Sequence, residues 1–61
     1  MLSEYPDVLT TEEACEALRC GYNMLYSLLM RNEIKAYRIG RVWRIPKQAV
    51  IDYILSQAKL K

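Results

Sequence analysis

The chain has 61 residues, of which 52% are hydrophobic and 26% are charged, and its formal net charge at pH 7 is +2. This composition excludes disorder, and the length predicts one domain near the lower limit for folding without a metal, disulfide or partner. No apolar run approaches the ~18 residues of a membrane span, and the acidic N-terminus does not resemble a signal peptide. We therefore expect a soluble, cytoplasmic protein with no membrane contact.

The first predicted helix covers residues 11–18 or 11–19, after a flexible lead-in at residues 1–8. Thr10 can cap this helix, and Glu13 stands three residues later as its partner in a capping box. The acidic side chains of the helix, including Glu13, are expected to form a solvated face, because nothing nearby would bury them or shift their pKa values.

The two cysteines, Cys15 and Cys20, do not form a recognisable metal site. They lie five residues apart in a chain without histidine, and two thiols cannot complete a tetrahedral zinc site. We expect both thiols to be reduced. The sequence also offers no nucleophile–base pair and no phosphate loop, so it predicts no enzyme, catalytic residue, cofactor or small-molecule substrate.

A second helix is predicted from Tyr22 to about Arg31, after a short turn that contains Gly21, and Asn32 suits the left-handed position after it. One side of this helix is apolar and is formed by Leu25, Leu28 and Leu29. The opposite side is formed by Asn23, Ser27 and Met30, flanked by Tyr26 and Arg31. Two short helices joined by such a turn are typical of a helix-turn-helix unit, whose second helix reads base edges in DNA.

Residues 36–45 predict a β-hairpin, or wing, that turns at Gly40. One register has a two-residue turn with glycine first, as in a type II′ turn, and places Arg38 opposite Trp43. This register mixes charged and apolar side chains on both faces of the hairpin.

The other register has a three-residue loop, with Ile39 opposite Trp43 and Tyr37 opposite Ile45. It makes one face wholly apolar and leaves Arg38 and Arg44 on the other face. The sequence leaves both registers open, and we favour this second one.

A last helix is predicted to begin at Pro46, where the missing N–H of proline costs nothing. Its wide apolar stripe consists of Val50, Ile51, Ile54, Leu55 and Ala58. This stripe is expected to close the core over the helical pair, although part of it could serve an oligomer or a partner. The predicted domain covers residues 9–58, and residues 59–61 are expected to fray.

The modest net charge conceals a strong separation of charge along the chain. Residues 1–18 hold five acids and no base, a charge of −5, whereas residues 19–47 hold seven bases against Glu33 alone, a charge of +6. Residues 48–61 contribute +1. Three arginines of the wing recur at every third residue: Arg38, Arg41 and Arg44. Such a basic segment favours a polyanionic partner, and nucleic acid is the obvious candidate.

The sequence resembles the excisionase family of small DNA-binding domains, a winged-helix group related to the MerR-type module. The resemblance extends from residue 9 to about residue 57. It is carried by Leu9-Thr10-Thr11-Glu12-Glu13-Ala14, by the turn at Gly21, by Leu25-Tyr26 with Leu28, and by Arg38-Ile39-Gly40-Arg41-Val42-Trp43-Arg44-Ile45. The last block is the most specific.

The resemblance implies an α+β, mainly α, winged helix-turn-helix with a two-stranded wing and a C-terminal helix. It implies binding to double-stranded DNA near the ends of an integrated mobile element, bending of that DNA, and assistance to a tyrosine-recombinase integrase. Cooperative self-association on DNA is expected, since one short helix reads few base pairs. The protein would then work at the bacterial or phage nucleoid.

The predicted DNA contacts fall into two groups. The recognition helix contributes Tyr22, Asn23, Tyr26, Ser27 and Arg31. The wing and its flank contribute Lys35, Arg38, Arg41 and Arg44. Within the first group, Asn23 can bond bidentately to adenine, while the arginines of the wing suit phosphates or a narrow minor groove.

This chain departs from the family pattern at three positions. Gly21 stands where a capping serine is usual, Ser27 where arginine is usual, and Lys35 where proline is common. The first two weaken the helix cap and base readout, respectively. Two other functions stay open: a transcriptional regulator of a mobile element, and a protein-interaction module that does not bind DNA.

Overall fold

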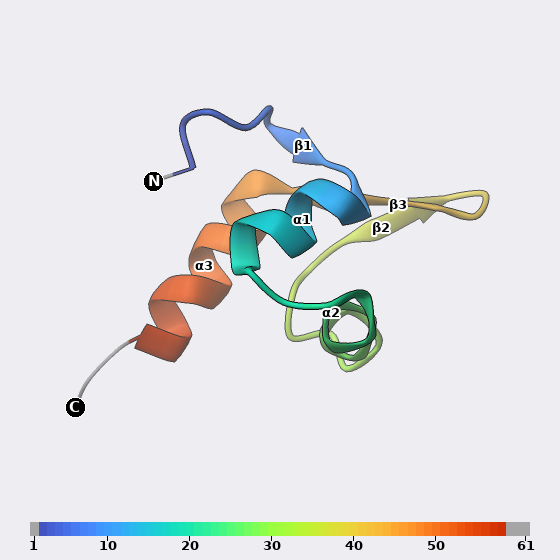
Figure 1. The fold of residues 1–61 in the computed structure, drawn as a ribbon. Helices are drawn as coiled ribbons and strands as arrows, with labels where there is room; N and C mark the ends of the chain where they lie inside the picture. Colours follow the sequence, from blue (N-terminus) through green and yellow to red (C-terminus); the bar gives the residue numbers. More distant parts are fainter. Residues whose placement is uncertain (1, 59–61) are drawn as a thin grey trace.

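The computed structural model describes residues 2–58 and contains three helices and three strands within that range. The elements, in chain order, are β1 (Val8–Leu9), α1 (Thr11–Leu18), α2 (Tyr22–Met30), β2 (Tyr37–Ile39), β3 (Val42–Pro46) and α3 (Lys47–Ala58). The expected fraying of residues 59–61 lies outside the described residues. In Figure 1 the β2–β3 hairpin extends from one side of the molecule and α3 leads away on the other. The predicted α+β winged helix-turn-helix is confirmed.

The strands form one antiparallel sheet in the order β1–β3–β2. The sequence predicts a wing of two strands only. The third strand, β1, is two residues long and pairs Val8 with Pro46 and Leu9 with Ile45. Because β1 contributes only two residues, it is too short to show the alternation of apolar and polar side chains by which a strand is recognised in a sequence.

The start of α1 follows the predicted capping box. The Thr10 side chain accepts a hydrogen bond from the Glu13 backbone N–H (3.1 Å), and the Glu13 carboxylate accepts one from the Thr10 N–H (3.0 Å). At its other end the left-handed conformation falls on Arg19, with φ 56°, and not on the nearby glycine. The capping box at the start of α1 thus gives hydrogen-bond partners to two backbone N–H groups, those of Thr10 and Glu13, that the helix itself would leave unpaired.

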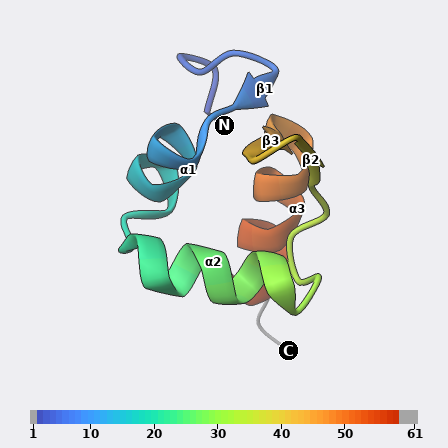
Figure 2. The ribbon, with the colours of Figure 1, turned by 90° about the vertical axis from the view of Figure 1, so that its right-hand side faces the viewer.

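Gly21, in the turn between α1 and α2, is the N-cap of α2 and has an extended conformation, with φ −81° and ψ 167°. No side-chain hydrogen bond caps this helix, as the replacement of serine by Gly21 predicts. Beyond the C-cap Arg31, Asn32 adopts φ 61°, the left-handed conformation predicted for it. Figure 2 shows α2 running crosswise between α1 and the C-terminal part of the fold.

The hairpin adopts the two-residue turn, so the favoured three-residue register is wrong. Tyr37 pairs with Arg44, Arg38 with Trp43, and Ile39 with Val42. Gly40 has φ 64°, as the first position of a type II′ turn requires, and this conformation strains any other residue. The favoured register gathers the apolar side chains of the wing on one face, but the wing extends past the core and leaves Tyr37 and Ile39 exposed.

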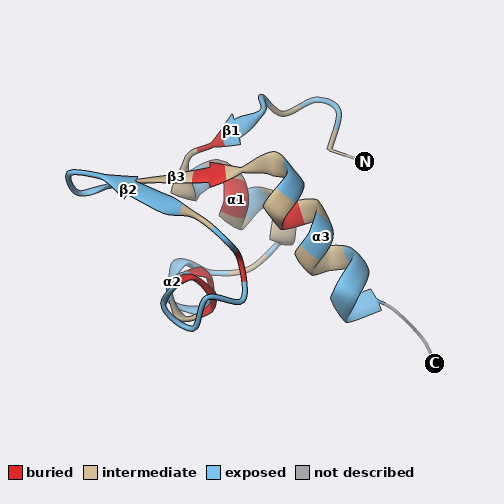
Figure 3. Ribbon diagram, turned by 180° about the vertical axis from the view of Figure 1, so that it is seen from behind, coloured by how far each residue is buried: buried red, intermediate tan, exposed pale blue. Residues whose placement is uncertain are grey.

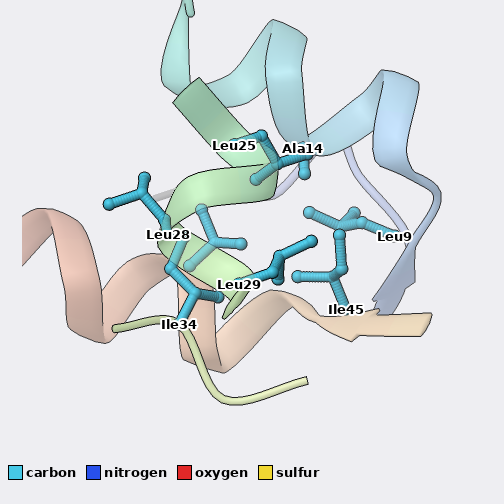
Figure 4. Close-up of a cluster of buried hydrophobic side chains, with 8 residues drawn as sticks. Leu9, Ala14, Leu25, Leu28, Leu29, Ile34 and Ile45 are labelled. Atoms are coloured by element: carbon cyan, nitrogen blue, oxygen red, sulfur yellow. The ribbon is translucent and has the colours of Figure 1, made fainter. Parts of the chain in front are cut away.

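The core lies where α1, α2, the base of the sheet and the start of α3 meet (Figure 3). Its eight buried side chains are Leu9, Ala14, Leu25, Leu28, Leu29, Ile34, Ile45 and Val50. Figure 4 shows the three α2 leucines on the side of the helix that faces this cluster, as predicted. Burial of that stripe, worth about 1.5–3 kcal/mol for each large side chain, orients α2 in the fold.

Residues 2–8 contact the rest of the domain at several points. The Asp7 carbonyl accepts a hydrogen bond from the Lys47 N–H (2.7 Å), and the Tyr5 carbonyl accepts one from Lys47 Nζ (3.1 Å). Leu2 and Tyr5 also pack against the core. These contacts join residues that are far apart in the sequence, which explains why sequence pattern does not reveal them.

The last helix begins at Lys47, one residue later than expected, because Pro46 is the last residue of β3. Its predicted apolar stripe is only partly used: Val50 is buried, Ile54 packs against the core, and Leu55 is exposed. Ala49 and Tyr53 pack against the core as well. The helix therefore closes the core with its first two turns and then projects beyond it (Figure 1).

Candidate nucleic-acid interface

The exposed side of α2 lies opposite its buried leucines and carries the residues predicted to contact bases. Tyr22, Asn23 and Tyr26 are exposed, whereas Ser27 is half-buried. The rings of Tyr22 and Tyr26, one helical turn apart, have centroids separated by 5.8 Å. Arg31 is exposed directly after the helix, at its C-cap. The structure therefore brings the five predicted α2 positions onto or beside one accessible face, with Ser27 the least accessible.

The wing presents two chemically different faces, which follow from its pairing. Residues paired directly across an antiparallel ladder lie on the same face, so Arg38 and Trp43 share one face and Tyr37 and Arg44 share the other. Ile45, two residues after Trp43, is on the face of Trp43 and is buried in the core. We call the face of Arg38 and Trp43 the inner face, because it is continuous with the core against which α2 packs.

On the inner face, the Arg38 guanidinium lies over the Trp43 ring, 4.9 Å from its centroid. Trp43 is half-buried and packs against the core, which makes it a fixed platform for the arginine. Arg41 follows Gly40 in the exposed turn at the tip. Sequence reasoning missed this stacking, because the favoured register does not place Arg38 opposite Trp43.

The outer face is formed by Tyr37, Ile39, Val42 and Arg44. The first three are exposed and Arg44 is half-buried. The prediction that Arg38 and Arg44 share a face is therefore wrong: the two-residue turn places them on opposite faces. The three arginines of the wing do not form a single cationic stripe.

Two lysines near the wing, Lys35 and Lys47, differ in their surroundings. Lys35 is exposed and lines a surface hollow, together with Glu33 and Asp52, between the loop after α2 and α3. Lys47, in contrast, is the residue that holds the N-terminal segment, with Nζ 3.9 Å from an Asp7 carboxylate oxygen. Because Lys47 makes these internal contacts, it is not available to bind a partner. No sequence pattern indicates this role.

The acidic N-terminal segment is organised by Tyr5, whose hydroxyl donates a hydrogen bond to Glu16 on α1 (3.1 Å). Partial burial raises the pKa of Tyr5 above the ordinary 10.0, and the hydrogen bond to Glu16 and the charges of Glu16, Glu4 and Glu13 raise it further. The phenol is thus the proton donor in this contact at neutral pH. The contact holds the acidic region to α1.

Cys15 and Cys20 are free thiols in the structure. Burial raises the pKa of Cys15, with smaller contributions from Cys20 and Glu12. A thiol with a raised pKa holds little thiolate at neutral pH and is a weak nucleophile. Within residues 2–58, no group of three or more His, Cys, Asp and Glu side chains is placed to hold a metal ion. In the same range, none of the helices has the length and apolar character needed to cross a membrane.

Comparisons with known proteins agree with this geometry. The family described as "Helix-turn-helix domain" matches residues 8–58. A protein of Saccharopolyspora erythraea described as a "Probable excisionase" is 46% identical over 46 residues, which cover 75% of this chain. The aligned region is 47% of that relative, so the chain spans about half the length of the curated relative that it matches. None of the solved structures is a significant match.

A family match over residues 8–58 covers both helices of the helix-turn-helix, the wing and α3. The similarity to a probable excisionase supports the same type of domain, with the DNA-binding character that a helix-turn-helix carries. The chain therefore belongs to the helix-turn-helix domain family and is of the excisionase type.

Proposed function

We propose that the protein is an excisionase: it binds duplex DNA near the ends of an integrated mobile element, bends that DNA and assists a tyrosine-recombinase integrase in excising the element. The observation that carries the proposal is that α2 and the wing both leave exposed surface, with the Arg38 guanidinium on the inner face of the wing, the face continuous with the core on which α2 packs. Similarity to a relative described as a probable excisionase supports the biological role.

In the proposed complex, α2 enters the major groove and presents Asn23, Tyr26 and Ser27 to base edges. Tyr22 and Arg31, at the two ends of the helix, contact phosphates. These roles follow from exposure on the side opposite the core and from the N-terminal position of Asn23 on the helix. Ser27, being half-buried, has the shortest reach of the three base-facing side chains.

The wing follows the neighbouring backbone or minor groove. Arg38 on the inner face and Arg41 at the tip are the principal contacts, and Lys35 adds a phosphate contact beside the wing. Arg44, on the outer face, is the weakest candidate of the four basic residues. Contacts made by α2 and by the wing at two places on one duplex would also offset the energy needed to bend the DNA.

Several copies are proposed to load cooperatively on adjacent sites, because one helix of nine residues reads too few base pairs to discriminate among genomic sequences. The integrase would supply the remaining specificity. The proposal places the protein in the cytoplasm, at the nucleoid.

The experiment combines selection of DNA sites with an excision assay. Sequences enriched from a random duplex library are located relative to integrase genes, and excision of an element that carries them is measured with the integrase, with and without this protein. Excision that depends on the protein supports the proposal. Binding that occurs only at a promoter, with excision unaffected, would identify a transcriptional regulator. The absence of a complex with any duplex at low salt would contradict DNA binding altogether.

A further inference from the structure

We propose that α2 selects A·T-rich sites by packing apolar side chains against thymine methyl groups while Asn23 reads adenine. This inference rests on the proposed binding of duplex DNA and specifies the chemistry that the recognition helix prefers. It concerns the face of α2 formed by Asn23, Tyr26, Ser27 and Met30, which we call the reading face.

The reading face contains no charged residue. None of the nine residues of α2 is Asp, Glu, Lys or Arg. Tyr26 is 39% exposed and Met30 is 56% exposed. A solvent-facing helix surface in a small domain is normally charged. Here, apolar atoms occupy the positions where a duplex would lie.

The side chains of the reading face are neighbours along the helix. Tyr26 and Met30 are four residues apart, and Asn23 precedes Tyr26 by three, spacings that place side chains beside one another on a helix surface. The Tyr22 ring lies beside the Tyr26 ring, with an angle of 30° between the two planes. The amide of Asn23 is therefore bordered by apolar surface.

An asparagine beside exposed apolar side chains fits A·T pairs better than G·C pairs. Guanine is read in the major groove mainly by arginine or lysine, neither of which occurs on α2, and the nearest cation, Arg31, follows the last helical residue. Asparagine pairs bidentately with N6 and N7 of adenine, and thymine is the only standard DNA base with a methyl group in the groove. The reading face has the groups for adenine and thymine and lacks the usual group for guanine.

Four alternating duplexes of equal length test the inference: d(A-T), d(A-U), d(G-C) and d(I-C). Uracil removes the thymine methyl and leaves the minor-groove edges of the pair unchanged. Inosine paired with cytosine keeps the minor-groove pattern of A·T but has the major-groove pattern of G·C. Dissociation constants at one fixed salt concentration are expected to be lowest for d(A-T), with about a fourfold loss for each methyl group removed from the interface.

The variant Met30→Ser should weaken binding to d(A-T) more than binding to d(A-U), and so reduce the preference for d(A-T) over d(A-U). Leu55→Ser is the matched control, because Leu55 has a similar exposure, 55%, but lies on α3. Circular dichroism of both variants verifies that the fold is retained.

Equal affinity for d(A-T) and d(A-U) would overturn the inference and leave DNA binding intact. Equal affinity for d(A-T) and d(I-C), with weaker binding to d(G-C), would also overturn it, because the preference would then arise in the minor groove. Failure to bind all four duplexes at low salt would instead contradict the proposed function itself.

Discussion

Arg38 and Trp43 face each other across the β2–β3 ladder, with the guanidinium 4.9 Å from the centroid of the indole ring. A cation over an aromatic face contributes about 0.5–1 kcal/mol at exposed sites. Because Trp43 packs against the core, the contact restricts Arg38 to the inner face of the wing before any partner arrives. A pre-positioned guanidinium loses less side-chain entropy when it meets a phosphate.

The separation of the wing arginines predicts unequal effects on DNA binding. Arg38→Ala should weaken binding to duplexes of every sequence and lower the slope of log K against log salt by about one, the signature of one lost phosphate contact. Arg44→Ala, on the outer face, should change both quantities less. Fluorescence anisotropy over a range of salt concentrations measures both. Equal losses for the two variants would show that the duplex does not favour the inner face over the outer face.

Arg38→Lys separates charge from stacking. Lysine keeps the positive charge but lacks the planar fork that stacks on indole and binds phosphate bidentately. We expect an affinity between that of the wild-type protein and that of Arg38→Ala, together with a changed Trp43 fluorescence. Wild-type affinity combined with wild-type fluorescence would mean that the stack contributes nothing to the wing.

The two glycines provide a matched pair of stability tests. A Cβ atom would meet nothing within 4 Å at either Gly21 or Gly40, so only the backbone conformation distinguishes them. Gly21→Ser should stabilise the fold by about 0.5–1 kcal/mol, because serine caps α2 and restricts the unfolded chain. Gly40→Ser should destabilise it by about 1–2 kcal/mol, since φ 64° strains a residue with a side chain.

Urea denaturation of both variants gives the change in the free energy of unfolding. A destabilising Gly21→Ser would mean that the serine hydroxyl fails to reach a free N–H of α2. Gly40→Ser with unchanged stability would indicate that the wing turn rearranges to a conformation with negative φ.

The elements that the sequence predicts well are those specified by local chemistry. The Thr10–Glu13 capping box, the α2 leucines and the left-handed Asn32 each depend on residues within a few positions of one another, and the structure has all of them. The exposed positions on α2 follow from the same helical period. The exposure of the candidate residues on α2 could therefore be predicted from the sequence.

The misjudged features depend on contacts between distant residues. The choice of hairpin register depended on whether Tyr37 and Ile39 need burial, and that depends on how far the wing extends past the core. The roles of Lys47 and of strand β1 depend on where the N-terminal segment crosses the fold. Neither local propensity nor periodicity contains that information.

The attachment of the N-terminal segment predicts a contrast between the two members of its ion pair. Lys47→Met keeps the apolar stem but removes the hydrogen bond to the Tyr5 carbonyl, and should cost about 1 kcal/mol. Asp7→Asn should change stability by no more than about 0.5 kcal/mol, because its carboxylate is exposed and its backbone carbonyl still accepts from Lys47. Urea titrations of both variants measure the contrast, and a larger effect of Asp7→Asn would contradict it.

The contact between Tyr5 and Glu16 predicts a change at alkaline pH. The folded pKa of Tyr5 lies above the 10.0 of an unperturbed phenol, so the folded chain holds this proton more tightly than the unfolded chain does. Its contribution to stability is therefore fully present below pH 10 and is lost as the pH rises through the folded pKa. The Tyr5→Phe variant should show less of this loss than the wild-type protein in urea titrations on either side of that pKa.

Replacement of the acceptor tests the cause of the shift. Glu16→Gln removes the negative charge beside the phenol and should lower the Tyr5 pKa toward its ordinary value, with the parts due to burial and to the charges of Glu4 and Glu13 retained. Glu12→Gln removes an acid from the same helix that contributes nothing to the Tyr5 shift, and should leave that pKa in place. The Tyr5 ring resonances, assigned in NMR spectra by their absence in Tyr5→Phe, report the titration. An identical Tyr5 pKa in Glu16→Gln and wild-type protein would mean that Glu16 contributes nothing to the raised pKa, and that its contact with Tyr5 does not hold the acidic segment to α1.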